Sequence, residues 1–392
     1  MTQMRSLELF SGAGGLAKGL ELANFEHSAF VEFNKHACLS LAENFEATKV
    51  FCGDIKDFDL GSLEHIDVVA GGPPCQPFSL GGKHKAHQDN RDMFPYAIRA
   101  IEKLTPQAFV FENVKGLLRP TFADYFEYII LRLTYPGFSL GSGMDWQEHL
   151  AQLRKVKALP YAGVKYNVQF KLLNAADYGI PQTRERVVIV GVRADLGKNW
   201  LFPEATHSED RLLWDMYVSG EYWKNHGIEP PQEYSSTAPA IQERISKLKE
   251  RYGFFEPTLQ PWKTVRDALK DVPSPCANHN IPDHIFKPGA RSYPGHTGSD
   301  YDWPSKTIKA GGHGVPGGEN MIRFADGSIR YFTVFEAKRI QTFPDSFVIK
   351  GAWGEAMRQI GNAVPVELAK IIGSKLATTL NQKTAVRRSS VG

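Results

Sequence analysis

The chain has 392 residues, which at about 150 residues per domain indicates two or three domains with a sizeable core. Apolar residues make up 42% and charged residues 23% of the chain, a composition typical of globular proteins that excludes a largely disordered polypeptide. Because the net charge is only +3, binding to nucleic acid would have to come from local clusters of basic residues. No stretch of about 18 uncharged apolar residues occurs, which excludes a membrane-spanning helix.

The four cysteines stand at irregular spacing: Cys38, Cys52, Cys75 and Cys276. This pattern predicts neither a disulfide framework nor a zinc site, and we expect no metal elsewhere. The amino end runs into an apolar strand without the pattern of a signal peptide. We therefore expect a reduced, cytoplasmic protein.

The first 195 residues alternate short apolar runs with helical patterns, which predicts a parallel sheet with crossover helices. The predicted strands are Leu7–Phe10, Ser28–Glu32, Val50–Cys52, Ile66–Ala70 and Ala108–Phe111. Helices are expected at Leu16–Ala23 and around Ile98, Ile101 and Leu104, which share one face. Two alternating runs, Tyr166–Leu173 and Arg186–Val192, could close the sheet as an antiparallel pair.

A separate, loop-rich lobe is expected after about Gly197, where the chain becomes rich in Pro, Gly, Trp and Tyr. Few helical patterns occur in this lobe beyond Ala240–Tyr252. Regular patterns return at Val334–Arg339 and in a last helix with Leu368, Ile372 and Leu376 on one stripe. Since such a stripe must be buried, we expect the last helix to pack on the first domain. The expected domains are residues 1–196, 197–330 and 331–392, the last returning to the first.

A glycine-rich turn, Phe10-Ser11-Gly12-Ala13-Gly14-Gly15, lies between the first strand and its helix. Glycines let the backbone approach a ligand closely. Glu32, at the end of the second strand, could accept hydrogen bonds from both hydroxyl groups of a ribose. Asp54, after the third strand, could accept a hydrogen bond from an adenine amino group. Gly12, Gly14 and Ala17 also satisfy the looser dinucleotide fingerprint, so a nicotinamide or flavin oxidoreductase remains an alternative.

A candidate nucleophile, Cys75, follows the strand Ile66–Ala70 in the segment Gly71–Ser79. Catalytic groups of open α/β sheets gather at the carboxyl ends of strands, and the prolines around Cys75 stiffen its loop. A thiol is only slightly ionised at neutral pH, so Cys75 would need a positively charged group nearby to act as a nucleophile. A buried apolar role suits Cys38 and Cys52, but it does not require the sequence Pro-Pro-Cys-Gln-Pro.

Polar residues also follow two other strands. Glu112, in Glu112-Asn113-Val114, would face the same crevice as Cys75 and could donate a proton if burial raises its pKa; a helix N-cap is the alternative. In Gln182–Arg186, the side chains of Arg184 and Arg186 would point to one face of an extended chain and stabilise a developing anion. The alternative for these arginines is a salt-bridged edge strand. Gln359–Pro365 predicts a turn and a helix that begins at proline.

These motifs, in this order, resemble those of the C5-cytosine DNA methyltransferases of the bacterial restriction–modification type. The matching segments are Phe10–Leu16, Glu32, Gly53-Asp54-Ile55, Gly71–Ser79, Glu112–Val114, Gln182–Val187 and Gly361–Pro365, which together extend over nearly the whole chain. The resemblance implies an α/β fold: a doubly wound, Rossmann-like methyltransferase sheet in a discontinuous large domain, with a smaller loop-rich target-recognition domain.

The resemblance also implies S-adenosylmethionine as cofactor. Its contacts would be Phe10, Gly12, Gly14, Leu16, Glu32, Asp54, Ile55, Pro74, Asn362 and Val364. The implied catalytic residues are Cys75, which would add to C6 of a flipped cytosine, Glu112 at N3, and Arg186 at O2 with Arg184 in support.

Duplex DNA is the implied substrate, and a cognate restriction endonuclease would act separately from a monomeric methyltransferase. The expected DNA contacts are Gln76, Ser79, Lys83, Lys85, Arg91, Arg291 and His296, of which Lys83 to Arg91 belong to a basic lid. A tRNA-directed cytosine-5 methyltransferase is the alternative, because it would use the same cysteine and glutamate. Asp92 stands where the family more often has glycine, and the segment 133–163 is longer than the family pattern needs.

Overall fold

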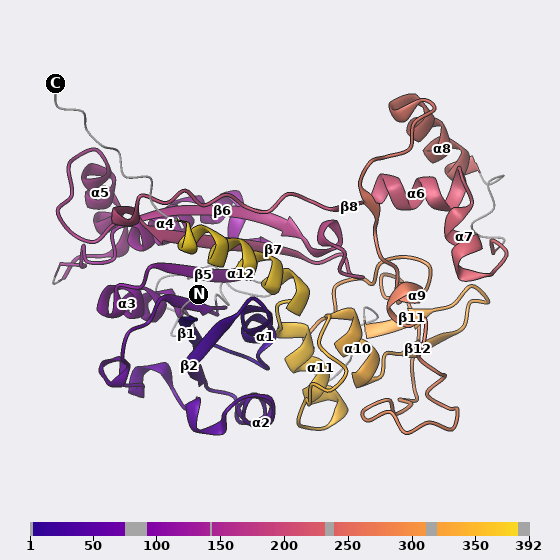
Figure 1. Ribbon diagram of the computed structural model, residues 1–392, viewed down its shortest axis with the longest axis horizontal. Coiled ribbons are helices and arrows are strands. Elements are labelled where there is room, and N and C mark those ends of the chain that lie inside the picture. Colours follow the sequence, from indigo (N-terminus) through magenta and orange to yellow (C-terminus); the bar gives the residue numbers. More distant parts are fainter. Residues whose placement is uncertain (1–2, 75–91, 142, 232–238, 311–319, 383–392) are drawn as a thin grey trace. The chain divides into compact units, whose positions relative to one another are not determined.

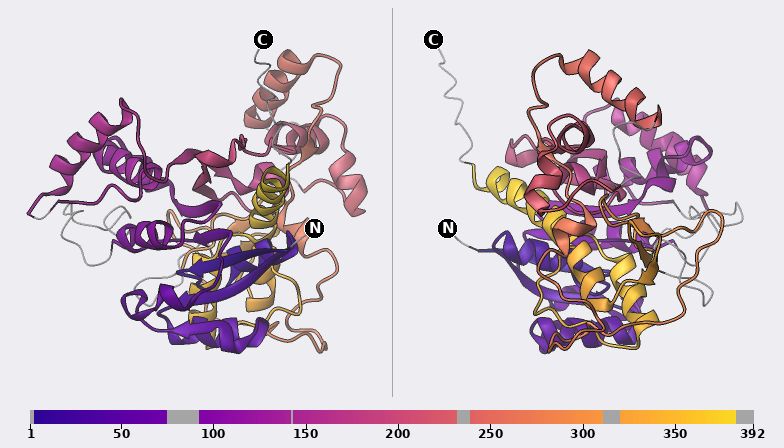
Figure 2. Two further views of the ribbon diagram at one scale, coloured as in Figure 1. Left: turned by 60° about the vertical axis from the view of Figure 1, so that its left-hand side comes forward. Right: turned by 90° about the vertical axis from the view of Figure 1, so that its right-hand side faces the viewer.

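The computed structural model describes residues 3–74, 92–141, 143–231, 239–310 and 320–382. The chain forms two compact units, whose elements are drawn in Figures 1 and 2. Unit 1 consists of Met1–Leu173, Glu185–Pro203 and Ala369–Gly392, and unit 2 of Asn174–Arg184 and Glu204–Leu368. The domain boundaries expected after residues 196 and 330 stay a prediction.

A seven-stranded sheet with the strand order β3-β2-β1-β4-β5-β7-β6 forms the centre of unit 1 (Figure 1). Its first five strands in this order are parallel, and β7 is antiparallel to β5. The predicted strands are all present, and the two runs expected to close the sheet are β6 and β7. The strands are β1 (Met4–Leu9), β2 (Phe25–Glu32), β3 (Val50–Cys52), β4 (Val68–Gly71), β5 (Ala108–Val114), β6 (Tyr166–Asn174) and β7 (Glu185–Arg193).

Helices cover both faces of this sheet, as neighbouring residues of β2 show. Ala29 and Val31 pack in one cluster with residues of α3 and α4, whereas Phe30 between them packs with α1 and α2. The predicted doubly wound α/β fold is therefore confirmed. The strand order reverses between β1 and β4, so ligands are expected at the carboxyl ends of these two strands. These helices are α1 (Gly15–Leu22), α2 (Lys35–Asn44), α3 (Phe94–Leu104) and α4 (Ala123–Thr134).

The last helix, α12 (Val366–Asn381), carries the apolar stripe that its sequence indicates. Leu368, Ile372 and Leu376 are each at most 1% exposed. At Gly373, an added Cβ would lie 2.8 Å from Leu20 Cδ2 and 3.0 Å from Ala23 Cβ. The absence of a side chain at Gly373 therefore lets α12 lie directly against the end of α1.

The segment 133–163 forms the second half of a helical hairpin, α4 with α5 (Trp146–Lys157) (Figure 2). Leu131, Tyr135, Leu150 and Leu153 make a small core between the two helices. Asp145 begins α5 with a capping box, which satisfies backbone N–H groups that the first turn leaves free. The described part of the segment thus packs as a helical hairpin, whose Tyr128 and Trp146 also pack against the main core of unit 1.

Buried His149 gives this hairpin a pH-dependent stability. The imidazole is 0% exposed, with Nδ1 3.1 Å from the Tyr128 hydroxyl and Nε2 3.1 Å from the Phe138 carbonyl oxygen. Burial, together with the charge of Arg132, lowers the pKa of His149 below 6.5. The unfolded chain then binds more protons than the folded one in the window just below the unfolded pKa, so stability falls as the pH falls through it.

We expect His149→Gln to reduce this acid sensitivity. The loss in free energy of unfolding between about pH 7 and about pH 5, measured by urea denaturation, should be smaller than in the wild type. Exposed His36→Gln is the control and should keep the wild-type slope. Equal slopes for His149→Gln and the wild type would contradict the assignment.

Unit 2 is built from short elements around an aromatic core. Its buried cluster of Leu212, Met216, Tyr222, Trp223 and Trp262 joins α6, α7 and the residue that follows β9. The elements are β8 (His207–Ser208), α6 (Glu209–Tyr217), α7 (Glu221–His226), α8 (Pro239–Tyr252), β9 (Gln260–Pro261), α9 (Val265–Ala268), β10 (Ser299–Asp300), β11 (Met321–Arg323), β12 (Ile329–Tyr331), α10 (Val334–Ile340) and α11 (Trp353–Asn362).

The expectation of few helices here beyond Ala240–Tyr252 is wrong, because α6 and α7 are also helical. The Ser208 side chain caps α6 by accepting a hydrogen bond from Arg211 N, and the two helices bury large aromatic side chains. Aromatic residues have only moderate helix propensity, so packing rather than a clear apolar period stabilises these helices.

The structure pairs Cys38 with Cys52 in a disulfide, which corrects the expectation that the cysteines form none. Their Cα atoms are 5.8 Å apart. Cys52 is the partner of Glu32 in the β2–β3 register, and Cys38 follows Glu32 in the first turn of α2. The fold brings together two residues whose spacing in the sequence carries no such signal.

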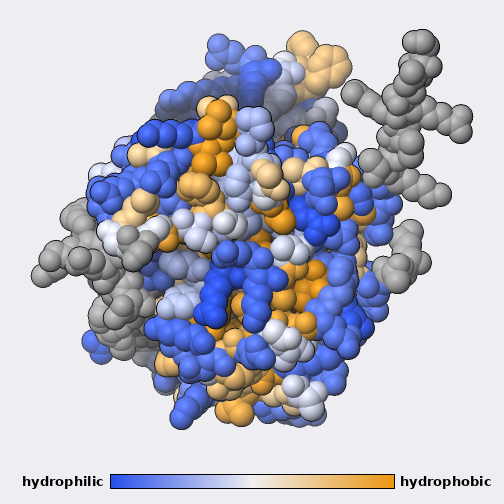
Figure 3. Space-filling view, turned by 90° about the vertical axis from the view of Figure 1, so that its left-hand side faces the viewer, coloured by the Kyte–Doolittle hydropathy of each residue, from blue (hydrophilic) through white to orange (hydrophobic). Residues whose placement is uncertain are grey.

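No helix in the described part of the chain is long and apolar enough to cross a membrane. The face shown in Figure 3 is mainly hydrophilic, and hydrophobic side chains reach it in separate small groups.

Candidate active site

The glycine-rich turn after β1 adopts backbone angles that favour glycine. Gly12 has φ +55° and Gly14 φ +89°, and Gly14 N donates a hydrogen bond to Ser11 O (2.9 Å). A Cβ atom added at Gly14 would lie 2.8 Å from Phe45 Cε2. A Cβ atom added at Gly12 would have no described atom within 4 Å. The turn is therefore tightly packed behind Gly14 and open beside Gly12.

Glu32, the last residue of β2, is held against this turn. Its carboxylate accepts hydrogen bonds from Gly12 N and from Asn34 N, both at 2.7 Å. These bonds fix the carboxylate at the carboxyl end of the strand next to the open side of Gly12. A backbone cradle beside a fixed acid is suited to a nucleoside whose ribose hydroxyls donate to that acid.

The other residues expected around this turn are placed as follows. Phe10 has φ +53° and is half-buried, and Leu16 is 8% exposed in the first turn of α1. Asp54 accepts a hydrogen bond from Lys56 N at 3.0 Å and so begins the short 3-10 helix that contains Ile55. β2 and β3 are neighbours, so Asp54 and Glu32 both follow strand ends on the same side of the sheet.

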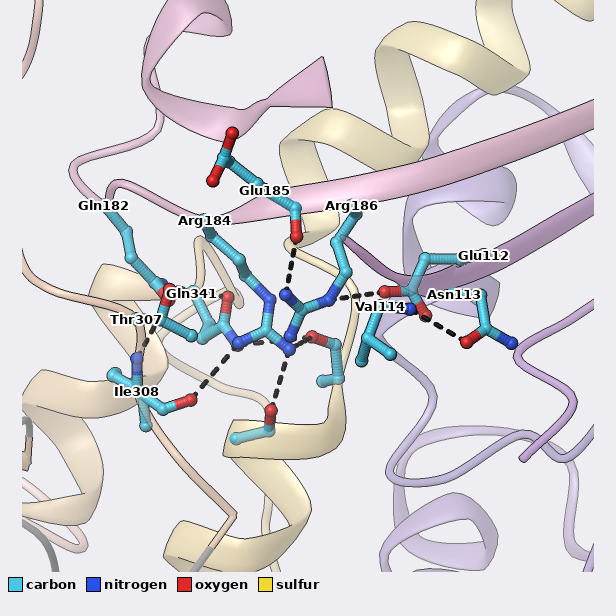
Figure 4. A network of polar contacts seen from close by, with 12 residues as sticks. Glu112, Asn113, Val114, Gln182, Arg184, Glu185, Arg186, Thr307, Ile308 and Gln341 are labelled. Atoms are coloured by element: carbon cyan, nitrogen blue, oxygen red, sulfur yellow. Dashed lines mark hydrogen bonds and ion pairs between the residues drawn. The ribbon is translucent and has the colours of Figure 1, made fainter. Parts of the chain in front are cut away.

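Glu112 and Arg186 form an ion pair between adjacent strands of unit 1 (Figure 4). Arg186 Nε lies 2.6 Å from Glu112 Oε1, and the two side chains are only 13% and 12% exposed. Glu112 lies within β5, which continues to Val114, so it is not a helix N-cap. A Cβ on Gly72 would lie 3.5 Å from Glu112 Oε2, which places the carboxylate beside the segment leading to Cys75.

Asn113 anchors that segment, a role that its motif did not indicate. It is 6% exposed, and its Nδ2 donates to Pro73 O at 2.9 Å. Pro74 is exposed, and its carbonyl oxygen accepts a hydrogen bond from Met93 N (3.2 Å). Six expected site residues lie outside the described residues: Cys75, Gln76, Ser79, Lys83, Lys85 and Arg91.

Arg184 belongs to unit 2 and has a different environment from Arg186. Its side chain is 1% exposed and donates to three backbone carbonyl oxygens: Ile308 (3.2 Å), Gly361 (2.7 Å) and Ala363 (3.0 Å) (Figure 4). Because its guanidinium is bound to backbone carbonyl oxygens, Arg184 holds the end of α11 in position and does not point to a substrate.

Two buried glutamines, Gln182 and Gln341, extend this hydrogen-bond network. The sequence did not indicate their structural role. Gln182 donates to Gln341 Oε1 (3.1 Å) and accepts from Ile308 N (3.0 Å). Gln341 in turn donates to Ile360 O (2.7 Å). The Gln-x-Arg segment thereby binds the loop between α11 and α12.

The remaining expected residues also lie in unit 2. Asn362 is exposed at the end of α11, and Val364 is 6% exposed. Arg291 is exposed, and His296 packs its ring 4.4 Å from that of Tyr293 in a short turn.

Comparison with known proteins assigns the chain to a family. Residues 4–142 and 147–378 match the family described as "C-5 cytosine-specific DNA methylase". The type II methyltransferase M.NgoMIV of Neisseria gonorrhoeae is 29% identical over 97% of this chain and 99% of its own length. M.SacI of Streptomyces achromogenes is 30% identical over 93% of this chain and 90% of its own. The structure of the S. pombe Dnmt2 methyltransferase has a TM-score of 0.56 at 16% identity, covering 97% of this chain and 100% of that one.

The chain belongs to the C-5 cytosine-specific DNA methylase family. It is a DNA (cytosine-5-)-methyltransferase that uses S-adenosylmethionine, which decides against the oxidoreductase alternative. The open glycine turn with its fixed carboxylate fits the adenosine part of this cofactor.

Glu32→Gln should weaken S-adenosylmethionine binding by about 10- to 100-fold, because a charge-assisted hydrogen bond contributes about 1.5–3 kcal/mol. Isothermal titration calorimetry with the cofactor measures this change. Glu64→Gln removes an exposed carboxylate elsewhere in unit 1 and should leave the affinity as in the wild type. Unchanged binding by Glu32→Gln would exclude the ribose contact.

Proposed function

We propose that this enzyme methylates C5 of a cytosine flipped out of a specific duplex DNA sequence, and that it protects DNA in a restriction–modification system. The observation that carries the proposal is the buried Glu112–Arg186 ion pair beside Gly72. The pair brings an acid and a positive charge beside Gly72, which precedes Cys75 by three residues in the sequence, and this supports the catalytic roles proposed below.

Cytosine C5 is too weakly nucleophilic to accept a methyl group unaided. In our proposal the Cys75 thiolate forms a bond to C6, and Glu112 hydrogen-bonds to or protonates N3 to absorb the charge. C5 of the resulting enamine takes the methyl group that S-adenosylmethionine supplies. A base then removes the C5 proton, and the C6–S bond breaks to release Cys75.

Arg186 would hold O2 of the base and favour the ionised thiol of Cys75, while its ion pair keeps the Glu112 carboxylate in position. Asn113 supports the same arrangement by fixing Pro73. None of the reacting base atoms is reachable in stacked duplex DNA, so the cytosine must leave the helix.

The proposed cofactor contacts are Phe10, Gly12, Gly14, Leu16, Glu32, Asp54, Ile55, Pro74, Asn362 and Val364. The expected DNA contacts are Gln76, Ser79, Lys83, Lys85 and Arg91 after the nucleophile, with Arg291 and His296 reading base edges. We propose a cytoplasmic monomer that acts independently of a cognate endonuclease.

Mechanism-based trapping tests this proposal. A duplex with 5-fluorocytosine at the target position should become covalently attached to the wild type when S-adenosylmethionine is present, because fluorine cannot leave as a proton does. Cys75→Ala should form no adduct, whereas Cys276→Ala, at an exposed free cysteine, should form it normally. Absence of an adduct with the wild type, or preferential methylation of tRNA, would overturn the proposal.

A further inference from the structure

Asp92 and the segment 133–163 are the two departures from the family pattern, and neither has a part in the proposed methyl-transfer chemistry. Asp92 directly precedes Met93, the N-cap of α3, and the segment 133–163 contains α5. Helix α4 packs on both α3 and α5 (Figure 1). The two departures can therefore be connected through α4.

The two carboxylate oxygens of Asp92 bind groups of two different helices. Oδ1 accepts a hydrogen bond from Phe94 N at 3.1 Å, which satisfies a backbone N–H in the first turn of α3. Oδ2 accepts a hydrogen bond from the hydroxyl group of Tyr125 in α4. A helix cap needs only the first of these bonds, and glycine at this position could make neither. Asp92 therefore ties the beginning of α3 to α4.

Tyr125 is supported in turn by the segment 133–163. Its side chain is buried, and its ring centroid lies 5.2 Å from that of Trp146 in a T-shaped arrangement. Trp146 is the first residue of α5 and directly follows Asp145, whose capping box fixes the beginning of that helix. The segment therefore restricts the position of the tyrosine hydroxyl group that binds Asp92.

The N-cap of α3 also binds the backbone that leads to the nucleophile. Met93 N donates a hydrogen bond to Pro74 O at 3.2 Å. This oxygen belongs to the peptide group that joins Pro74 to Cys75, and a peptide group is planar. The preceding carbonyl oxygen, of Pro73, accepts a hydrogen bond from Asn113 Nδ2 at 2.9 Å. Two successive carbonyl groups are thus held, one from β5 and the other from the beginning of α3.

We propose that Asp92, Tyr125 and Trp146 are positioning residues for the nucleophile Cys75. By fixing the beginning of α3, they hold the backbone N–H that binds the carbonyl group next to Cys75. This inference rests on the proposed role of Cys75 in methyl transfer. It gives the segment 133–163 a role in catalysis, because its helix α5 supports the tyrosine that binds Asp92.

Tyr125→Phe removes the hydroxyl group and keeps the ring that packs on Trp146. At saturating DNA and cofactor, the single-turnover rate of attachment to the 5-fluorocytosine duplex should fall about 10- to 100-fold, since a misplacement of about 1 Å can reduce a rate about 10²-fold. The affinities for S-adenosylmethionine and for duplex DNA should stay within about twofold of the wild type, because the loss lies in the chemical step.

Tyr128→Phe is the matched control, since it makes the same change three residues further along α4. The Tyr128 hydroxyl group lies 3.1 Å from His149 Nδ1, and the Tyr128 ring also packs near Trp146, with centroids 5.8 Å apart. This variant loses a hydrogen bond of the same helical hairpin but keeps the one to Asp92. We expect it to be attached to the duplex at the wild-type rate.

A double-mutant cycle tests whether Asp92 and Tyr125 act through their shared bond. Asp92→Ser keeps a side-chain oxygen for Phe94 N but has no second oxygen for the tyrosine. It should be slowed as much as Tyr125→Phe, and the double variant should be no slower than either single variant. Trp146→Leu removes the supporting ring and should slow attachment by a smaller factor.

Three results would overturn this inference alone while the wild type is trapped normally. They are a wild-type rate for Tyr125→Phe or Asp92→Ser, losses that multiply in the double variant, and an equal loss in Tyr128→Phe. A change confined to affinity or to stability, at an unchanged rate of attachment, would equally reduce Asp92 to a helix cap. Absence of an adduct with the wild type would overturn the proposed function, and this inference with it.

Discussion

Glu112→Gln should reduce the rate of methyl transfer by about 10²- to 10⁴-fold, the range typical of a positioned acid or base. Glutamine preserves the size of the side chain and one hydrogen bond, but it can neither donate a proton to N3 nor form the ion pair with Arg186. Single-turnover transfer of a radioactive methyl group to duplex DNA measures the chemical step without the contribution of product release.

Glu185→Gln is a close control for this variant. Glu185 is adjacent to Arg186 but pairs with Lys115 at 2.7 Å on an exposed surface, so its loss should leave the rate within about twofold of the wild type. A Glu112→Gln enzyme as fast as Glu185→Gln would exclude Glu112 from the chemistry. Affinity for S-adenosylmethionine should be the same in both variants.

Arg184→Met should destabilise the protein by about 3 kcal/mol or more. Methionine fills much of the same space but leaves the carbonyl oxygens of Ile308 and Gly361 without this donor, whereas Ala363 O still accepts from Gln341 (3.2 Å). Each buried unpaired group costs about 1–3 kcal/mol. Urea denaturation followed by circular dichroism gives the change in the free energy of unfolding.

Arg186→Met separates structure from catalysis. Arg186 is bound to the Glu112 carboxylate in a pair whose side chains are 13% and 12% exposed, so water can reach the carboxylate that its replacement leaves, and activity should fall more than stability. Similar stability losses for the two methionine variants would show that Arg184 has no special structural role. Full activity of Arg184→Met per folded molecule would show that Arg184 contributes to stability alone and does not contact the substrate.

The sheet could be predicted closely because β4 and most of β5 are buried apolar runs and the strands are separated by clear turns. β3 has the predicted bounds, and β1, β2 and β4 differ by a few residues at their ends. Helices α6 and α7 could not be found in this way, because their aromatic side chains become a core only when Trp262, about 40 residues further along, packs on them. Tertiary packing overrides local pattern in such a segment.

The candidate site was predictable where a residue type has a chemical reason to follow a strand. Glu32 is the last residue of β2 and Glu112 lies near the end of β5, and the structure shows a defined partner for each carboxylate. The roles of Asn113 and Gln341 could not be predicted. Both side chains donate hydrogen bonds to backbone carbonyl oxygens, and only the fold decides which carbonyl groups need such a donor. For Arg184, the alternation of side chains along an extended segment predicts the direction of the side chain. It does not predict the backbone carbonyl oxygens that the side chain binds.

The contact of Gly373 with Leu20 and Ala23 has a consequence for synthesis on the ribosome. The surface of α1 around Leu20 is translated roughly 350 residues before Gly373, which covers it. Unit 1 therefore cannot complete its packing until α12 has been made, and this apolar surface stays open in the meantime. Until α12 has left the ribosome, we expect this surface to be available to chaperones.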